Sequence, residues 1–178
     1  LKADVVIGSH EDEDHTNFSL VEGSFEKLVE FGSFTVNDVS IELCEGSHGT
    51  LEGQSLGTVR MALIKADGLT ILHCSDLQVI PTGAALQKLM NLDIVLCPVG
   101  GGYTFGPEKA KEFLDMIKPK IAIPMHYKTD RLTIPLDPSA IGNFEKLCPN
   151  MENLGKSELV ISKADISDKC RIIKMNYA

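Results

Sequence analysis

Two histidines flank four consecutive carboxylates near the start of the chain, in the stretch Ser9-His10-Glu11-Asp12-Glu13-Asp14-His15. Like charges at this spacing repel one another, so a loop folded at the end of a buried strand needs a compensating cation. The imidazoles of His10 and His15, with the carboxylates of Asp12 and Asp14, supply the nitrogen and oxygen ligands that Zn, Mn or Fe accept. A solvated acidic turn with two incidental histidines explains the same residues, because charge runs usually lie on solvated faces.

The length, charge and cysteine content of the chain limit the class of protein to which this stretch can belong. The 178 residues suit one domain with a sizeable core. The net charge of −8 argues against a nucleic-acid partner and against a membrane partner with anionic lipids. Five widely spaced cysteines without a Cys-x-x-Cys pair are typical of a reduced, cytoplasmic protein with buried thiols.

The hydrophobic pattern predicts strand hairpins first and alternating helices and strands afterwards. A buried strand over residues 3–7 leads directly into His10. Hairpin turns are expected at Asn37-Asp38 and Asp67-Gly68, and residues 50–55 are expected to form a loop. The pattern predicts strands over 27–36, 39–43, 58–65, 69–74, 93–97, 119–124, 160–162 and 171–175, and helices over 82–90, 107–118 and 139–147. These elements indicate a layered fold in which helices pack on mostly β sheets.

Residues that can bind a metal recur at or just after the ends of these strands. Such ends lie at the edges of sheets, where functional sites are usually built. A single histidine at a strand end is more often a satisfied polar residue than a ligand, but the recurrence makes coincidence a weaker explanation. His73 lies inside its strand and is interpreted as structural. The residues at strand ends are His10, Asp12, Asp14, His15, His48, Asp76 and His126.

In order and spacing, these residues resemble the metal signature of the metallo-β-lactamase fold superfamily. Cys74-Ser75-Asp76, Pro98-Val99-Gly100-Gly101 and Pro124-Met125-His126-Tyr127 resemble its branch of ascorbate-6-phosphate lactonase-like hydrolases. The resemblance implies an α+β fold, a four-layer αββα sandwich, as a single domain over residues 1–178. The strands that open this fold are absent before Leu1, so we expect the sequence to lack an N-terminal piece.

The resemblance also implies a ligand set for one or two divalent metal ions, Zn, Mn or Fe. His10, Asp12 and His48 would hold one ion; Asp14, His15 and His126 would hold the other, and Asp76 would bridge them. A metal-bound hydroxide would attack the substrate, and Asp14 would orient it and take its proton. The family usually has a histidine where this chain has Asp12. A carboxylate there adds a hard oxygen ligand, which favours Mn, Fe or Mg over Zn and can weaken that position.

The glycine-rich stretch after the strand at 93–97 has two interpretations. Backbone N–H groups ahead of a helix that begins at Pro107 favour an anion, and hydroxyls would add hydrogen-bond donors. A flexible connection between a strand and a helix explains the glycines equally well. The residues expected to bind substrate here are Gly101, Gly102, Tyr103 and Thr104.

The sequence therefore favours a metal-dependent hydrolase that acts on a small anionic ester, lactone or phosphodiester. The alternative is a catalytically weakened member of the same fold that binds a metal or ligand without turnover, and Asp12 favours this alternative. A nuclease of the superfamily ranks lower, because the short stretch between Asp76 and His126 leaves no room for an extra domain. The substrate, the metal and the presence of a homo-oligomer stay open.

Overall fold

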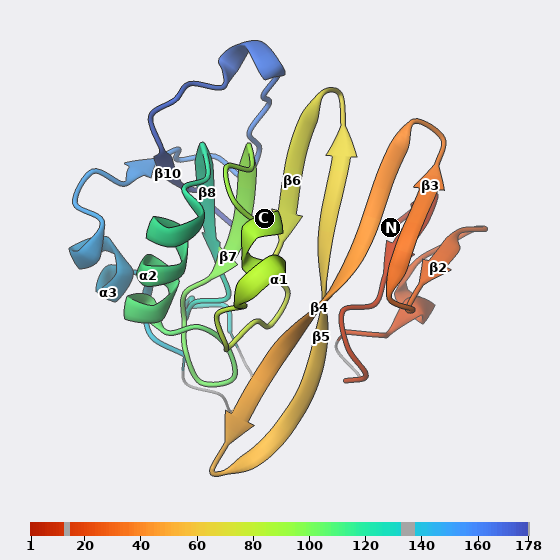
Figure 1. The fold of residues 1–178 in the computed structure, drawn as a ribbon, viewed down its shortest axis with the longest axis horizontal. Helices are drawn as coiled ribbons and strands as arrows, with labels where there is room; N and C mark the ends of the chain where they lie inside the picture. The colour runs from red at the N-terminus through yellow and green to blue at the C-terminus, as the bar shows by residue number, and fades with distance from the viewer. Residues whose placement is uncertain (13–14, 133–137, 178) are drawn as a thin grey trace.

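A mixed eight-stranded sheet forms the centre of the protein (Figure 1). The computed structural model describes residues 1–12, 15–132 and 138–177. A separate parallel pair of strands, β1 (Val5–Ile7) and β2 (Glu26–Leu28), lies beside the sheet near β3. In spatial order the large sheet contains β3 (Gly32–Val36), β4 (Val39–Leu51), β5 (Gln54–Ala66), β6 (Leu69–His73), β7 (Ile94–Pro98), β8 (Ile121–Met125), β10 (Arg171–Lys174) and β9 (Glu152–Asn153).

The sheet has an antiparallel half and a parallel half. Strands β3 to β6 follow one another as antiparallel hairpins. The turn from β5 to β6 has positive φ at both Asp67 (51°) and Gly68 (74°), which matches the right-handed twist of the strands on either side. Strands β6, β7, β8 and β10 are parallel to one another, so their carboxyl ends meet at one edge of the sheet.

The helices α1 (Gly83–Lys88), α2 (Pro107–Ile117) and α3 (Ile141–Leu147) cover one face of the parallel half (Figure 1). Pro107 starts α2 where its missing N–H costs no hydrogen bond. Phe113 of α2 and Phe144 of α3 are fully buried with Leu72 and Val95 of the sheet. This apolar layer fixes the parallel strands that carry Asp76 and His126 at their ends.

The opposite face of the sheet is covered by two other segments. Leu28 of β2 packs on Ile41 and Ala62 of the antiparallel half. In the parallel half, Ile94 and Ile121 pack beneath a segment that follows β9 and contains Leu154, Leu159, Ile161 and Ile166. Successive side chains of a strand alternate between faces, which is why the two faces collect different apolar residues.

Most of the expected elements are present, and the architecture is the expected combination of a large sheet with helices packed on it. Three expectations are wrong. The strand expected over 27–36 is two strands, because β2 pairs with β1 whereas β3 pairs with β4 in the large sheet. Residues 50–55 are not a loop, because β4 and β5 continue to a tight turn at Glu52 and Gly53. The strand expected over 160–162 is absent. Instead Ser162 forms a reciprocal capping box with Asp165 at a short 3₁₀-helix, η2 (Lys163–Asp165).

A second short 3₁₀-helix, η1 (Phe18–Leu20), follows the acidic motif. No helix in the described part of the chain is long and apolar enough to cross a membrane.

Candidate metal centre

Four separate segments bring the candidate metal-binding residues together. His10 follows β1, His48 lies within β4, Asp76 follows β6 and His126 follows β8. Because β6 and β8 are both parallel to β7, Asp76 and His126 leave the sheet at the same edge. His126 has a φ of +52°, a left-handed conformation that is rare outside glycine and that turns the chain sharply after Met125.

A β-bulge aims His48 at this edge. Ser47 is paired with Thr58 and Gly49 with Gly57, so β4 has one extra residue at His48. Such a bulge bends the strand and redirects a side chain without ending the ladder. His48 is buried as a result, and its ring lies edge-on to that of His10 at a centroid distance of 4.8 Å. The sequence predicted a ligand here but placed it at a strand end.

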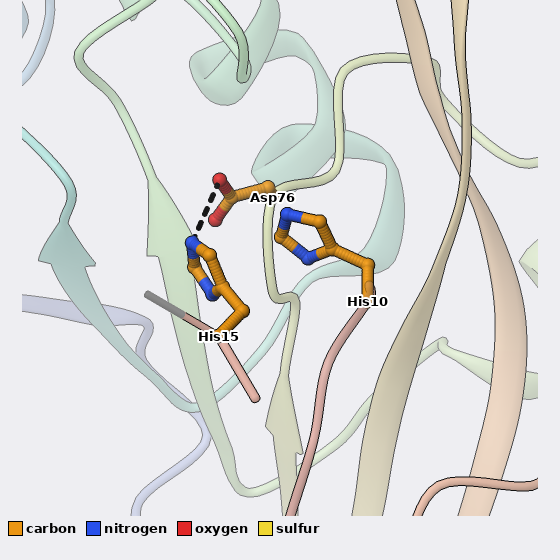
Figure 2. A group of neighbouring side chains, drawn as sticks. All are labelled: His10, His15 and Asp76. Carbon is orange, nitrogen blue, oxygen red and sulfur yellow. Dashed lines mark ion pairs between the residues drawn. The ribbon is translucent and has the colours of Figure 1, made fainter. Parts of the chain in front are cut away.

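Asp76 lies at the centre of one group of candidate ligands, formed with His10 and His15 and called the Asp76 group. Its Oδ2 lies 3.6 Å from Nε2 of His15 and 3.7 Å from Nε2 of His126. Figure 2 shows Asp76 and His15 facing each other, with the ring of His10 beside them. One ligand atom each from His10, His15 and Asp76 can be chosen within 4.8 Å of one another, which is close enough to hold a single ion.

His10 also belongs to another group, formed with Asp12 and His48, whose ligand atoms lie within the same 4.8 Å limit. Its Nε2 lies 3.2 Å from Oδ2 of Asp12. The two histidines are buried, but the Asp12 side chain is 66% exposed. The structure thus brings together the three residues expected at the first metal position, with the carboxylate on the solvent side.

The chemistry of these atoms fits a divalent cation. Among the described residues, Nδ1 of His48 and Nδ1 of His126 are buried without a hydrogen-bond partner, and Nε2 of His10 is buried and forms no hydrogen bond even though Asp12 is 3.2 Å away. Burial, reinforced by the nearby His15, lowers the pKa of His10, although Asp76 and Asp12 oppose this effect. A neutral imidazole keeps a lone pair for a metal, and carboxylates supply the negative charge that offsets the ion.

Arg60 of β5 fixes the loop that carries His10. Its backbone N–H donates to the Ser9 carbonyl at 2.7 Å, and its Nη1 donates to the Gly8 carbonyl at 3.0 Å. Nη2 forms an ion pair with Glu11 at 2.7 Å. Part of the charge of the acidic motif is therefore balanced by an arginine. Sequence analysis missed this role, because Arg60 lies about 50 residues away in an ordinary strand.

Ser75 connects the Asp76 turn to the same strand. The Ser75 hydroxyl donates to the Arg60 carbonyl at 2.6 Å, and its backbone N–H donates to Nδ1 of His73 at 3.1 Å. This hydrogen bond agrees with the structural interpretation of His73, which stays a prediction. Burial lowers the pKa of His73, and this outweighs the opposing effect of Asp76.

Asp14 and the glycine-rich loop are the remaining parts of the predicted site. Asp14, expected to bind metal and take a proton, lies outside the described residues. In the glycine-rich loop, Oγ1 of Thr104 is buried and directed at the carbonyl oxygens of Gly101 and Phe105, both 3.4 Å away. The Gly102 carbonyl accepts a hydrogen bond from Gln78. The substrate-binding role of Gly101, Gly102, Tyr103 and Thr104 stays a prediction.

Comparison with known proteins identifies the family. Residues 1–126 match the model of the Beta-lactamase superfamily domain. A solved structure from Thermotoga maritima, described as a candidate Zn-dependent hydrolase of the metallo-beta-lactamase superfamily, is 33% identical, with a TM-score of 0.75. The match covers 98% of this chain and 84% of that one. The chain belongs to the metallo-β-lactamase superfamily.

Curated relatives in this superfamily carry the name UPF0173 metal-dependent hydrolase. The relative from Pelotomaculum thermopropionicum is 34% identical over 157 residues, which cover 72% of this chain and 69% of the relative. The relative from Thermococcus kodakarensis is 32% identical over 103 residues, and this match covers 57% of this chain and 46% of the relative. The chain therefore spans between about half and two thirds of the length of these metallo-β-lactamase superfamily proteins.

Proposed function

We propose that this protein is a metal-dependent hydrolase of small anionic esters, lactones or phosphodiesters, with the two ligand groups as its active site. The observation that carries the proposal is the convergence of His15 and His126 on one oxygen of Asp76, at 3.6 and 3.7 Å. The names of the relatives from Pelotomaculum thermopropionicum and Thermococcus kodakarensis support the reaction class.

The chain contributes positions and charge states to this reaction. His10 is kept neutral by burial, so its nitrogen is available to an ion without first losing a proton. His48 is fixed by the bulge, and His126 by the tight turn after β8. When bound, a divalent ion would supply Lewis-acid chemistry, which makes water more acidic and polarises the substrate oxygen. The residues that would hold it are His10, Asp12, His48, His15, Asp76 and His126.

An anionic substrate agrees with the charge of the site only when ions are bound. The acidic motif and Asp76 give the metal-free site an excess of negative charge, which repels anions. Bound divalent cations offset this charge and attract a carboxylate or phosphate. The loop over residues 101–104 lies ahead of the N-terminus of α2, where backbone N–H groups also favour an anion.

A second candidate function is metal or ligand binding without turnover. Asp12 favours it, because an exposed carboxylate at the first position holds an ion less firmly than a buried imidazole would. Occupancy of only one position would then leave the reaction without its second ion.

The two functions are separated by metal content and turnover measured on the same preparations. The protein is loaded with Zn or Mn, its bound metal is counted by elemental analysis, and it is assayed with p-nitrophenyl acetate, a γ-lactone and bis-p-nitrophenyl phosphate. Metal-dependent turnover that disappears in Asp76→Ala supports the hydrolase. Stoichiometric metal without turnover on any ester, lactone or phosphodiester tested favours the binding function.

A further inference from the structure

The hydroxyl of Ser9 lies between two of the histidines of the metal centre. Its Oγ is 3.0 Å from Nδ1 of His10 and 3.0 Å from Nδ1 of His15. The two rings are 4.1 Å apart between centroids and tilted by 33°. A single oxygen atom therefore contacts the same nitrogen of both rings, on the side away from their Nε2 atoms.

We propose that Ser9 is a positioning residue that sets the tautomer and the ring orientation of His10 and His15 together. The two nitrogens of an imidazole lie on different sides of the ring, so a hydrogen bond at Nδ1 directs Nε2 the other way. In this structure Nε2 of His10 faces Asp12 at 3.2 Å, and Nε2 of His15 faces Asp76 at 3.6 Å. Ser9 thus orients His10, which belongs to both ligand groups, and His15, which belongs to the group with Asp76.

Counting hydrogens shows which arrangement at Ser9 leaves the Nε2 atoms of both rings available to metal. A neutral histidine carries one N–H, and a serine oxygen has two lone pairs and one hydrogen. When both rings are protonated at Nδ1, both donate to Ser9 Oγ, and both Nε2 lone pairs are available to metal. If Ser9 instead donates to one Nδ1, that ring carries its proton on Nε2, where it blocks a ligand bond.

The backbone of Ser9 is held in place independently of the histidines. Its carbonyl accepts from the Arg60 N–H at 2.7 Å, and the carbonyl of the preceding Gly8 accepts from the Arg60 side chain. Both bonds tie this segment to β5. Strand β5 therefore holds the backbone of Ser9, and the rings of His10 and His15 adjust to its hydroxyl.

A matched pair of substitutions isolates the hydroxyl. Threonine keeps the oxygen and adds a methyl group, and valine has the same shape without the oxygen. Ser9 lines a cavity of about 380 Å³ together with Ile7, Ala62 and Ile64, so the added methyl can be accommodated. Ser9→Thr and Ser9→Val thus differ in the hydrogen bonds to His10 and His15, while their volumes are nearly equal. Ser9→Ala serves as a smaller variant if either one folds poorly.

The experiment measures zinc affinity by competition with a chromogenic chelator, and the tautomers by ¹⁵N-detected histidine NMR of the zinc-loaded full chain. We expect Ser9→Val to lose about 10- to 100-fold in zinc affinity, the usual cost of removing a partner that orients a metal ligand. Ser9→Thr should stay within about threefold of the unchanged protein. In the unchanged protein and in Ser9→Thr, His10 and His15 should both show Nδ1–H and metal at Nε2.

The inference rests on the proposed metal-dependent function, and the same measurements separate the two. If the unchanged protein binds no divalent ion, the hydrolase proposal and this inference both fail. If the unchanged protein binds zinc but Ser9→Val and Ser9→Thr bind it equally well with the same tautomers, the role of Ser9 is overturned and the hydrolase proposal stands.

Discussion

Asp12 should determine how firmly the proposed first metal position holds an ion. Its carboxylate contacts Nε2 of His10 at 3.2 Å, yet its side chain is 66% exposed. A carboxylate is shorter than an imidazole and a harder ligand, so this position should prefer Mn, Fe or Mg and bind Zn weakly. We expect Asp12→Ala to lower the metal content by about one ion per chain, and Asp12→His to raise zinc affinity. Titration of metal into both variants, followed by elemental analysis, checks this.

Asp76→Ala is the control for the Asp12 variants. Asp76 lies against His15 and His126 of the second position. In the bridging role that the family resemblance implies for Asp76, its loss should empty both positions rather than one. Equal stoichiometry in Asp12→Ala and the unchanged protein would show that Asp12 binds nothing. The binding function without turnover would then gain support.

His73 should make the metal-free protein less stable in acid. Burial lowers the pKa of His73 below its usual 6.5. Between the lowered folded value and 6.5 the unfolded chain binds more protons than the folded one, so stability falls as the pH falls through this window. The loss from one such group approaches about 1.4 kcal/mol per pH unit within the window. Urea unfolding of the chelator-treated protein between pH 7.5 and 5 measures it.

His73→Gln removes this titration and should flatten the pH dependence. Glutamine keeps a polar group that can accept the hydrogen bond from the Ser75 N–H. The buried His10 also has a lowered pKa, so part of the slope should remain. An unchanged slope in His73→Gln would assign the acid sensitivity to other groups.

At the scale of elements, the loop after β7 and the turn after β8 are built against each other. A Cβ atom on Gly100 would lie 2.0 Å from the backbone oxygen of His126 and 2.9 Å from Cβ of Pro138. The carbonyl of Gly100 also accepts from the Ser139 N–H at 2.6 Å. The absence of a side chain at Gly100 is therefore what lets the His126 turn come this close.

Gly100→Ala should displace His126 and so weaken metal binding. We expect a loss of about 1–3 kcal/mol in unfolding free energy, as for other overpacked sites, together with lower metal content. Gly106→Ala is the matched control in the same loop, because its φ is −75° and its added Cβ would lie 4.0 Å from the Cα of Gly101. Urea unfolding and metal analysis of both variants test this. Equal behaviour of the two variants would contradict the proposed contact.

The elements that sequence could predict are those whose signal is local. The turn at Asp67-Gly68 and the start of α2 at Pro107 depend on backbone preferences of the residues themselves. The extension of β4 past His48 could not be predicted, because its stretch is polar and glycine-bearing, and its bulge depends on pairing with β5. The prediction of a strand over 160–162 is wrong because the local capping box at Ser162 competes with strand pairing.

The candidate site likewise contains residues that the sequence could predict and residues that it could not. Histidines and aspartates at strand ends could be identified because ligand chemistry restricts residue type. The positioning of these ligands by Ser9 and Arg60 could not, because serine and arginine have many common roles. Their contacts also depend on how β5 lies beside the loop after β1.

For the whole molecule, the metal centre connects parts of the chain that otherwise have separate apolar cores. His10 and His15 come from the segment after β1, whose core lies on one face of the sheet, whereas Asp76 and His126 leave strands packed against the helices. In the metal-free state the carboxylates in this centre repel one another. A bound ion should therefore stabilise the assembled fold in addition to providing chemistry.

Metal should accordingly raise the unfolding free energy of the full chain in a concentration-dependent manner. For each ion that binds only the folded state, a tenfold rise in free metal above the Kd adds about 1.4 kcal/mol. We expect the Tm, measured by calorimetry, to rise with free zinc or manganese and to fall when a chelator removes the metal. Asp76→Ala should show little response, because in the bridging role that the resemblance implies both positions lose a ligand, while Gly106→Ala should respond like the unchanged protein. A Tm of the unchanged protein that is the same with excess metal and with excess chelator would mean that metal does not bind the folded centre, since linkage requires a shift whenever a ligand prefers the folded state.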